Sequence, residues 1–423
     1  MPITFLIFIF LVWAEYFGLG AFIPLYKKLP IPLLLAFGLF VYVISKNKFK
    51  PVMEYKIAKY YMLFMFMTFS AMLYGVIQSY AIDPFKMQLG YFMLLVIAFY
   101  IIENKKNIMV YAWMYTITHV SLVFLNLNKM GGQREGAFKG SYFIGDGNDF
   151  AWSLNTALPI AFFLLFSSNK MIVRYGVIFI IGIILLGIIG TQSRGAALAL
   201  TAGFIYYFLF VTKRKMSALV VVLLVASVVT VLAPANYFTR METISSYEED
   251  TSAMGRIKAW RTATEMAVDN PVLGVGAGSF NSAYGRSYRK PNDPVRWIST
   301  HSVYFKVLAE YGFLGMFFYL MIIISCFKTN NRTRDIIERN PDKYEISALW
   351  PKCLNWSLTS WSVCAMFLTG LDYPHLFLLA GLTMSINRIV TNSNNDPSAV
   401  TEKSKKLTPW EQDHGGFSAD VFK

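Results

Sequence analysis

Two arginines and one histidine stand where they could bind an anion and assist a proton transfer. Arg194 follows Ser193 where an apolar run begins, and His301 stands at the mouth of another apolar run. Arg256 lies between them, in a basic stretch from about 237 to 300. Two guanidinium groups offer paired donors to phosphate oxygens, and a neutral imidazole can take a proton from a hydroxyl. This pattern indicates a diphosphate ligand and an attacking hydroxyl.

Arg194 has two interpretations. Ser193 is a suitable N-cap, and a helix start supplies free N–H groups and a partial positive charge, which together favour a diphosphate. Alternatively, the arginine extends to lipid headgroups, as cationic side chains at helix ends often do. That alternative explains the charge but not the small side chains of Gly195 and Ala196, which would let a ligand or another backbone come close.

Arg256 belongs to a predicted surface helix that ends at Asn270-Pro271. Its segment, 254–300, has more cationic than acidic residues, so an anionic ligand is the natural counterpart. We expect Trp260 at headgroup level and Arg256 turned toward a pocket. In the alternative, an interfacial helix only brings its arginines to lipid phosphates. The apolar face of this helix is predicted to hold Ile257, Trp260, Ala263 and Ala267.

His301 is predicted in the first turn of a helix, with Ser299 and Thr300 as caps. The helix dipole and the cationic loop would lower the pKa of its imidazole and keep it neutral near pH 7. Glu310 would point to the opposite side of this helix and pack rather than orient His301. The alternative is a histidine with a structural role at a helix start. His375, after Tyr373-Pro374, could line the same pocket.

The elements that must position these residues are membrane-spanning helices. With 55% hydrophobic and 15% charged residues, the chain is too apolar for a soluble multidomain protein. The predicted fold is all-α and polytopic, with about twelve transmembrane helices and one long external loop. Each apolar run is roughly 17 to 25 residues long, enough to cross a bilayer. The runs are 3–22, 30–45, 59–79, 87–102, 108–127, 149–167, 172–190, 195–211, 217–234, 301–327, 347–369 and 374–390.

Positive charges predict the orientation of these helices. With both termini in the cytoplasm, the short inner loops hold 17 lysines and arginines and the short outer loops hold 7, as the positive-inside rule requires. The long basic loop then lies outside the membrane. The first span lacks a positive n-region and a cleavage site, so we expect it to be retained. The three cysteines form neither a disulfide framework nor a metal motif.

The glycine-rich stretch from Pro271 to Ser279 superficially matches a phosphate-binding loop. Such a loop needs a preceding strand in a βαβ unit, and neither a strand nor nucleotides are expected at the outer face. Its glycines are instead expected to allow a tight crossing of the chain over the helix bundle.

Four motifs occur in order along the central part of the chain. They are Gln192-Ser193-Arg194-Gly195-Ala196, Gly255-Arg256 with Trp260, Pro271-x-x-Gly274-x-Gly276, and His301-Ser302 followed by Leu308, Glu310, Gly312 and Gly315. Together they resemble the O-antigen ligase and polymerase superfamily, and the likeness is dense over about 140–320. The segment Gly145-Asp146-Gly147-Asn148-Asp149-Phe150-Ala151 is also similar to one common there. Ser302 departs from the family, because asparagine usually follows the histidine there.

This resemblance implies a metal-independent, inverting glycosyltransferase of the membrane-embedded GT-C type, without a cofactor. The donor would be a glycan on undecaprenyl diphosphate, and the acceptor a glycan, lipid A core or protein. Arg194 and Arg256 would hold the diphosphate, and His301 would orient or deprotonate the acceptor. Arg261, Arg289 and His375 are secondary candidates. Nucleic acid is not an expected partner, and the expected location is the bacterial cytoplasmic membrane, with the active site on its periplasmic or external face.

The predicted organisation has three parts. Residues 1–127 form five N-terminal transmembrane helices, 128–390 form the ligase-like core with the external loop 235–300, and 391–423 form a polar cytoplasmic tail that we expect to be disordered.

The motifs leave the reaction open between a ligase, which is slightly favoured, and an O-antigen or exopolysaccharide polymerase that extends lipid-linked repeats. A polysaccharide exporter is the alternative from another class, and it predicts functional charges at mid-membrane and paired halves. A scaffolding membrane protein would leave Arg194 and His301 dispensable.

Overall fold

A computed structural model describes residues 1–23, 31–46, 49–130, 138–213, 251–291 and 298–395, with scattered positions between 215 and 230. Regular secondary structure within these ranges is helical, and no strand occurs in them. The predicted all-α class is therefore confirmed. The polar tail and most of the ninth predicted span, 217–234, lie outside the described residues.

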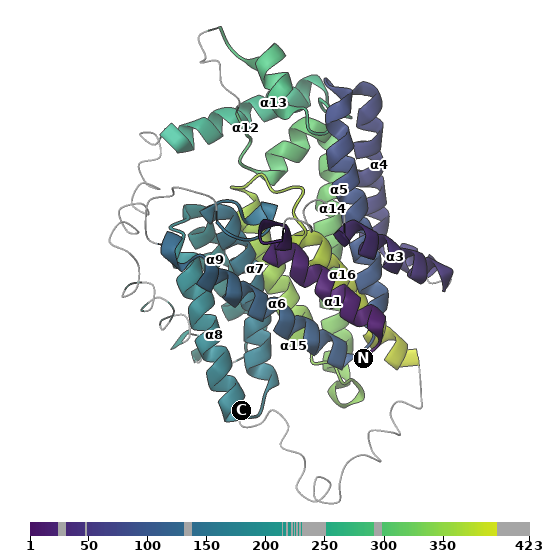
Figure 1. The fold of residues 1–423 in the computed structure, drawn as a ribbon, viewed down its shortest axis with the longest axis vertical. Coiled ribbons are helices and arrows are strands. Elements are labelled where there is room, and N and C mark those ends of the chain that lie inside the picture. The colour runs from purple at the N-terminus through teal and green to yellow at the C-terminus, as the bar shows by residue number, and fades with distance from the viewer. Residues whose placement is uncertain are drawn as a thin grey trace, which may run out of the picture.

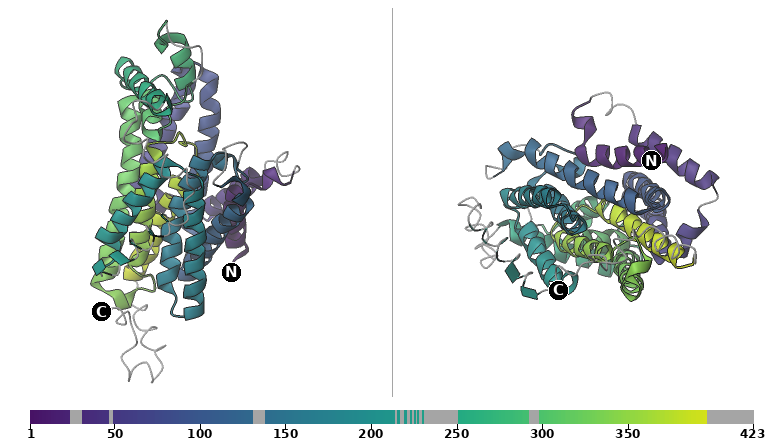
Figure 2. Two further views of the ribbon diagram at one scale, coloured as in Figure 1. Left: turned by 90° about the vertical axis from the view of Figure 1, so that its left-hand side faces the viewer. Right: turned by 90° about the horizontal axis from the view of Figure 1, so that it is seen from below.

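The long helices run side by side as a bundle, and two further helices lie at one end of it, beside the ends of α4 and α14 (Figures 1 and 2). The bundle contains α1 (Ile3–Phe17), α3 (Ile31–Ser45), α4 (Lys56–Tyr74), α5 (Ile82–Ile101), α6 (Lys105–Leu125), α7 (Gly147–Ser167), α8 (Met171–Gly190), α9 (Arg194–Tyr206), α14 (Val303–Arg339), α15 (Leu349–Ala365) and α16 (His375–Asn395). The end is covered by α12 (Thr251–Asp269) and α13 (Phe280–Ala283).

Seven helices in the described part of the chain are long and apolar enough to cross a membrane. They are α4, α5, α6, α7, α8, α9 with the short π-helical segment that continues it, and α14. Helices also form in the predicted spans 3–22, 30–45, 347–369 and 374–390. Of these, α1 and α3 are shorter apolar helices that lie obliquely on one side of the bundle (Figure 2, left). The molecule is a multi-pass membrane protein, and the total of twelve spans stays a prediction.

The centre of the bundle is α7, which is buried on nearly all sides and packs against α8, α6 and α15. Large aromatic side chains fill these contacts. Phe163 stacks on Trp350 at 3.7 Å between ring centroids, and Trp152 packs against Trp361. The close contact of α9 with α15 depends on Gly203, because a Cβ there would approach Ser360 Oγ to 2.4 Å. This packing holds the start of α9 in place.

The glycine-rich stretch crosses α14 as a closely packed loop, as expected. The N–H groups of Val275 and Gly276 donate to the carbonyl oxygens of Ala309 and Glu310 at 2.9 and 3.0 Å. Gly276 has a φ of 97°, and a Cβ on it would lie 2.4 Å from Gly75 Cα. Only glycine fits such a close approach of two backbones.

The side chain of Glu310 binds this loop. Its two carboxylate oxygens accept the N–H groups of Gly278 and Phe280 at 3.0 and 3.3 Å. α14 breaks at the same level, where Gly312 has φ 64° and ψ −167°. The packing role expected for Glu310 is confirmed, because it anchors the loop between α12 and α13.

Candidate functional site

His301 precedes α14 rather than forming part of its first turn. The N-cap is Ser302, whose Oγ accepts the N–H of Phe305 at 3.5 Å. The prediction that Ser299 and Thr300 cap this helix is therefore wrong. Thr300 Oγ1 donates instead to the carbonyl of Ser302, and Ser299 hydrogen-bonds Thr369. Serine and asparagine are both strong N-caps, so Ser302 can supply the same contact as the asparagine of related sequences.

Two non-glycine residues in the described part of the chain have a positive φ; one is a predicted site residue and the other lies close to one. His301 has a φ of 45°, and Gln192, two residues before Arg194, has a φ of 51°. A left-handed conformation costs about 1 to 3 kcal/mol and is concentrated at functional sites, where the surrounding structure imposes it. These outliers support a functional role for both turns.

Arg194 is the first residue of α9, as predicted, and Ser193 caps the helix by accepting the N–H of Ala196 at 3.3 Å. The arginine side chain is half-buried. The small residue next to it serves packing, because a Cβ added to Gly195 would come within 3.1 Å of Phe367. A helix start with an arginine beside it suits an anion, and the diphosphate-binding role of Arg194 stays a prediction.

Arg256 lies in the second turn of α12, which ends at Asp269 as Asn270-Pro271 predicted. The buried face of this helix differs in part from the predicted one. Two of the predicted residues, Ala263 and Ala267, are fully buried as expected, and Ile257 is half-exposed. Ala259 and Met266, which were not predicted, are also fully buried against the loop and α14.

Trp260 is held by contacts within the protein, and its placement at headgroup level stays a prediction. Its ring stacks on Phe305 at 5.1 Å and an interplanar angle of 9°, and its Nε1 donates to the carbonyl of Thr300 at 2.8 Å. These contacts fix α12 to the start of α14, directly beside His301. The helix is thus part of the folded site and not only an interfacial anchor.

His301 is exposed, yet the protein around it affects its charge. Partial desolvation and the nearby Arg256 guanidinium lower the pKa of the imidazole, and Asp146 opposes them. The predicted lowering of the His301 pKa is thereby supported. Arg256 is one of the cations expected to cause it, whereas the contribution of burial was not predicted. The imidazole of His301 therefore stays neutral at a lower pH than an ordinary histidine does, and only the neutral form can accept a proton.

Asp146 is a further candidate for the site, because its charge acts on His301, and this effect was not predicted from the sequence. It caps α7 by accepting the N–H groups of Asn148 and Asp149 at 2.6 and 3.0 Å. A cap of this kind can be recognised in the sequence as an aspartate just before an apolar run, but its proximity to His301 cannot.

The connection between α15 and α16, residues 366–374, joins the two turns. Phe367 packs on Gly195 of α9, and Thr369 hydrogen-bonds Ser299 at 3.0 Å. Farther along, Asp372 forms an ion pair with Lys306 of α14 at 3.2 Å. The Arg194 turn and the His301 loop are consequently held by one short segment.

The comparison with protein families agrees with this site. Residues 177–320 match the family model described as O-Antigen ligase. This central part of the chain, about a third of its length, is therefore similar to the O-antigen ligase family. No match among curated proteins was found. The matched residues include Arg194, Arg256 and His301, whereas Asp146 and Asp372 lie outside them.

Of the secondary candidates, His375 does not line the candidate site. It is fully buried, and its Nδ1 hydrogen-bonds the hydroxyl of Tyr16 at 2.7 Å. Trp152 and Phe143 pack around the ring. The prediction that it lines the pocket is wrong because α16 turns this residue into the bundle.

The other two secondary candidates lie on the outer elements. Arg261 is exposed and lines a groove along α12. Arg289 is half-buried and ends the short helical segment Tyr284–Tyr288, where its N–H donates to the carbonyl of Tyr284 at 2.8 Å. A phosphate-binding role for either arginine stays a prediction.

Asp146→Asn is expected to move the acidic limb of the pH profile of kcat/KM to lower pH. The carboxylate raises the pKa of His301, so its loss lowers that pKa further and keeps the imidazole neutral in more acidic solution. Asparagine also caps helices, so α7 should be retained. Asp83→Asn, at an exposed carboxylate on α5, is the control and should leave the profile unchanged. An unchanged profile for Asp146→Asn would contradict control of the rate by His301.

Proposed function

We propose that the protein transfers a glycan from undecaprenyl diphosphate to an acceptor at the outer face of the bacterial cytoplasmic membrane. The observation that carries this proposal is the meeting of three elements. The helix start at Arg194 and the loop of His301 share the α15–α16 connection, and α12 brings Arg256 within electrostatic range of His301. Cations at a helix start suit a diphosphate, and a neutral histidine suits a hydroxyl nucleophile.

In the proposed reaction, the acceptor oxygen attacks the anomeric carbon of the donor glycan. The bond between that carbon and the diphosphate oxygen breaks, and undecaprenyl diphosphate leaves with both electrons. His301 accepts the proton of the acceptor hydroxyl, and Arg194 and Arg256 stabilise the charge that develops on the diphosphate. In-line attack inverts the anomeric configuration, and no glycosyl-enzyme intermediate is needed.

A ligase is our first proposal, and a polymerase that extends lipid-linked repeats is the second. The two use the same donor chemistry and differ in the acceptor. An exporter is less well supported, because it requires functional charges inside the membrane. Glu310, a buried carboxylate of α14, instead accepts the N–H groups of the glycine-rich loop.

Purified protein incubated with a synthetic undecaprenyl-diphosphate glycan tests the reaction. We expect transfer to a lipid A core or protein acceptor, and longer lipid-linked chains would identify a polymerase instead. Because arginines are proposed to neutralise the leaving group, EDTA should leave the rate unchanged. In the described part of the chain, no group of three or more His, Cys, Asp and Glu residues could hold a metal ion. Failure of the glycan to leave the donor with any acceptor would refute the proposal.

A further inference from the structure

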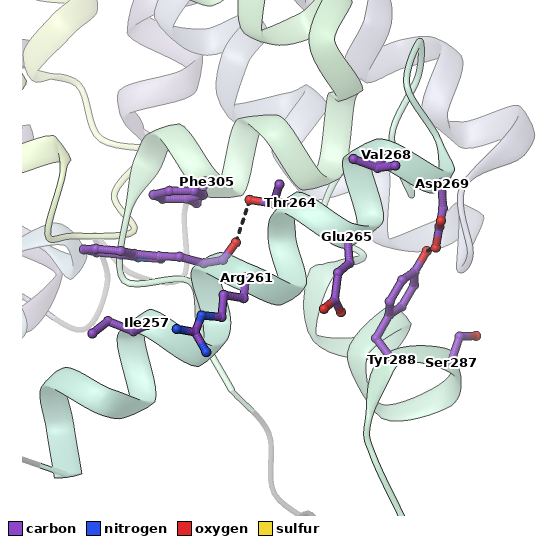
Figure 3. Close-up of a pocket in the computed structure, with 10 residues that line it drawn as sticks. Ile257, Arg261, Thr264, Glu265, Val268, Asp269, Ser287, Tyr288 and Phe305 are labelled. Carbon is purple, nitrogen blue, oxygen red and sulfur yellow. Dashed lines mark hydrogen bonds between the residues drawn. The ribbon is translucent and has the colours of Figure 1, made fainter. Parts of the chain in front are cut away.

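An open groove of about 730 Å³ lies along α12, on the outer side of the site (Figure 3). One end is formed by the stacked rings of Trp260 and Phe305. Farther along α12 the lining includes Glu265 and Val268, and the opposite wall is formed by Tyr288. Val268 has an exposed fraction of 62%, so the groove is accessible from outside the protein.

The groove combines a rigid aromatic surface with paired polar groups. Trp260 is fixed by its stacking and by its hydrogen bond to Thr300. Asp269 accepts a hydrogen bond from the Tyr288 hydroxyl at 2.9 Å. Burial and this carboxylate raise the pKa of Tyr288 to about 12, so its hydroxyl stays protonated. Arg261 and Glu265 add one cation and one anion to the wall.

This chemistry matches a saccharide better than a phosphate or an acyl chain. A sugar ring presents a face of C–H groups, which packs on an aromatic ring, and a rim of hydroxyls that both donate and accept hydrogen bonds. The groove offers carboxylate acceptors and guanidinium and hydroxyl donors for such a rim. A phosphate would meet two carboxylates, and an acyl chain would leave the charged groups desolvated without partners.

The groove is continuous with the proposed site. Trp260 follows Arg256 by four residues on α12, which places them about one helical turn apart on the same side. The Trp260 ring also binds Thr300, the residue before His301. A saccharide in the groove would therefore reach toward His301, the residue proposed to meet the acceptor hydroxyl.

A second cavity of about 570 Å³ extends the binding surface. It is lined by Tyr74, Asn270 and Leu273, and it shares Ser287 and Tyr288 with the first groove. Cavities of this size are typical of small-ligand sites. Together they offer room for an oligosaccharide that passes over Tyr288.

We propose that the groove along α12 binds the acceptor glycan, with its reacting end directed to His301 and the next sugars on Trp260, Phe305 and Tyr288. This inference rests on the proposed function, because it assigns a substrate to one side of that site.

Blocking the groove at a distance from the reacting groups tests the assignment. Val268→Trp places a large ring in the groove, and Glu265→Ala removes a polar partner from an exposed position. Met254→Trp is the matched control, because Met254 is an exposed apolar residue of the same helix that does not line the groove. The probe is an oligosaccharide pool from partial hydrolysis of the host's own surface glycans, with the core oligosaccharide of the proposed acceptor included. Its binding to the full-length protein in nanodiscs is measured without donor.

We expect wild type and Met254→Trp to bind the pool equally, and Val268→Trp and Glu265→Ala to bind it at least about tenfold more weakly, a loss of about 1.4 kcal/mol. Binding of the undecaprenyl-diphosphate glycan should be the same in all four proteins. Unchanged oligosaccharide binding in both groove variants, or no binding by wild type, would overturn the inference. So would weaker binding of the donor, which would assign the groove to the donor glycan. Oligosaccharide binding without transfer would refute the proposed function alone.

Discussion

Replacing Arg194, Arg256 or His301 by alanine is expected to abolish glycan transfer while the amount of protein in the membrane stays unchanged. Loss of one charge-stabilising donor typically lowers kcat by about 10²- to 10³-fold, and loss of a general base by about 10²- to 10⁴-fold. The three side chains lie at the surface of the site and are exposed or half-buried, so their removal should not unfold the bundle. Transfer is measured with purified protein, and abundance by quantitative immunoblotting of membranes.

Conservative variants separate the chemical roles from the structural ones. Arginine to lysine at position 194 or 256 keeps the charge but loses the paired donors, so activity should fall without disappearing. His301→Asn keeps a residue that tolerates the left-handed conformation, so loss of activity there cannot be attributed to backbone strain. Lys86→Ala, at an exposed lysine of α5, should transfer normally. Wild-type rates in all three alanine variants would refute the assignment of the site.

Gly276→Ala is expected to destabilise the protein by about 3 kcal/mol or more and to abolish transfer. A side chain here meets both an unfavourable φ of 97° and a contact of 2.4 Å with the backbone of Gly75, which cannot move away easily. The displaced loop follows directly after α12, so Arg256 and Trp260 would lose their positions. Thermal unfolding in nanodiscs reports the stability.

Gly255→Ala is the matched control for this prediction. Gly255 lies within α12, next to Arg256, and a Cβ there would meet nothing within 4 Å. Alanine favours the helix over glycine, so the variant should be as stable as wild type or more stable by up to about 1 kcal/mol. If Gly276→Ala unfolds at the same temperature as Gly255→Ala, the loop does not depend on this close approach.

Much of the architecture was predictable because it depends on the hydrophobicity and the capping residues of short stretches of the chain. Apolar runs of bilayer length indicate membrane helices wherever they occur. The start of α9 at Arg194 and the end of α12 before Pro271 follow from the capping serine and the proline. The glycine-rich crossing was also predicted, because repeated glycines in a loop indicate close backbone contact.

The start of α14 shows how such local signals compete. Ser299, Thr300 and Ser302 are all residues that can cap a helix, and the choice among them decides whether His301 belongs to the helix. In the folded protein, Ser299 is engaged by Thr369 from a distant segment, and Ser302 becomes the cap. His301 is left outside the helix, in a left-handed conformation that no local pattern indicated.

The sequence by itself determined the membrane class, the positions of Arg194 and Arg256 on their helices, and the family resemblance over the central part of the chain. The tertiary structure decided which side chains face the site. It turned His375 into the core against Tyr16, 359 residues away, docked Trp260 on α14, and brought Asp146 near His301. These outcomes depend on how each helix is rotated about its axis, and that rotation is set by packing between segments that are far apart in the chain.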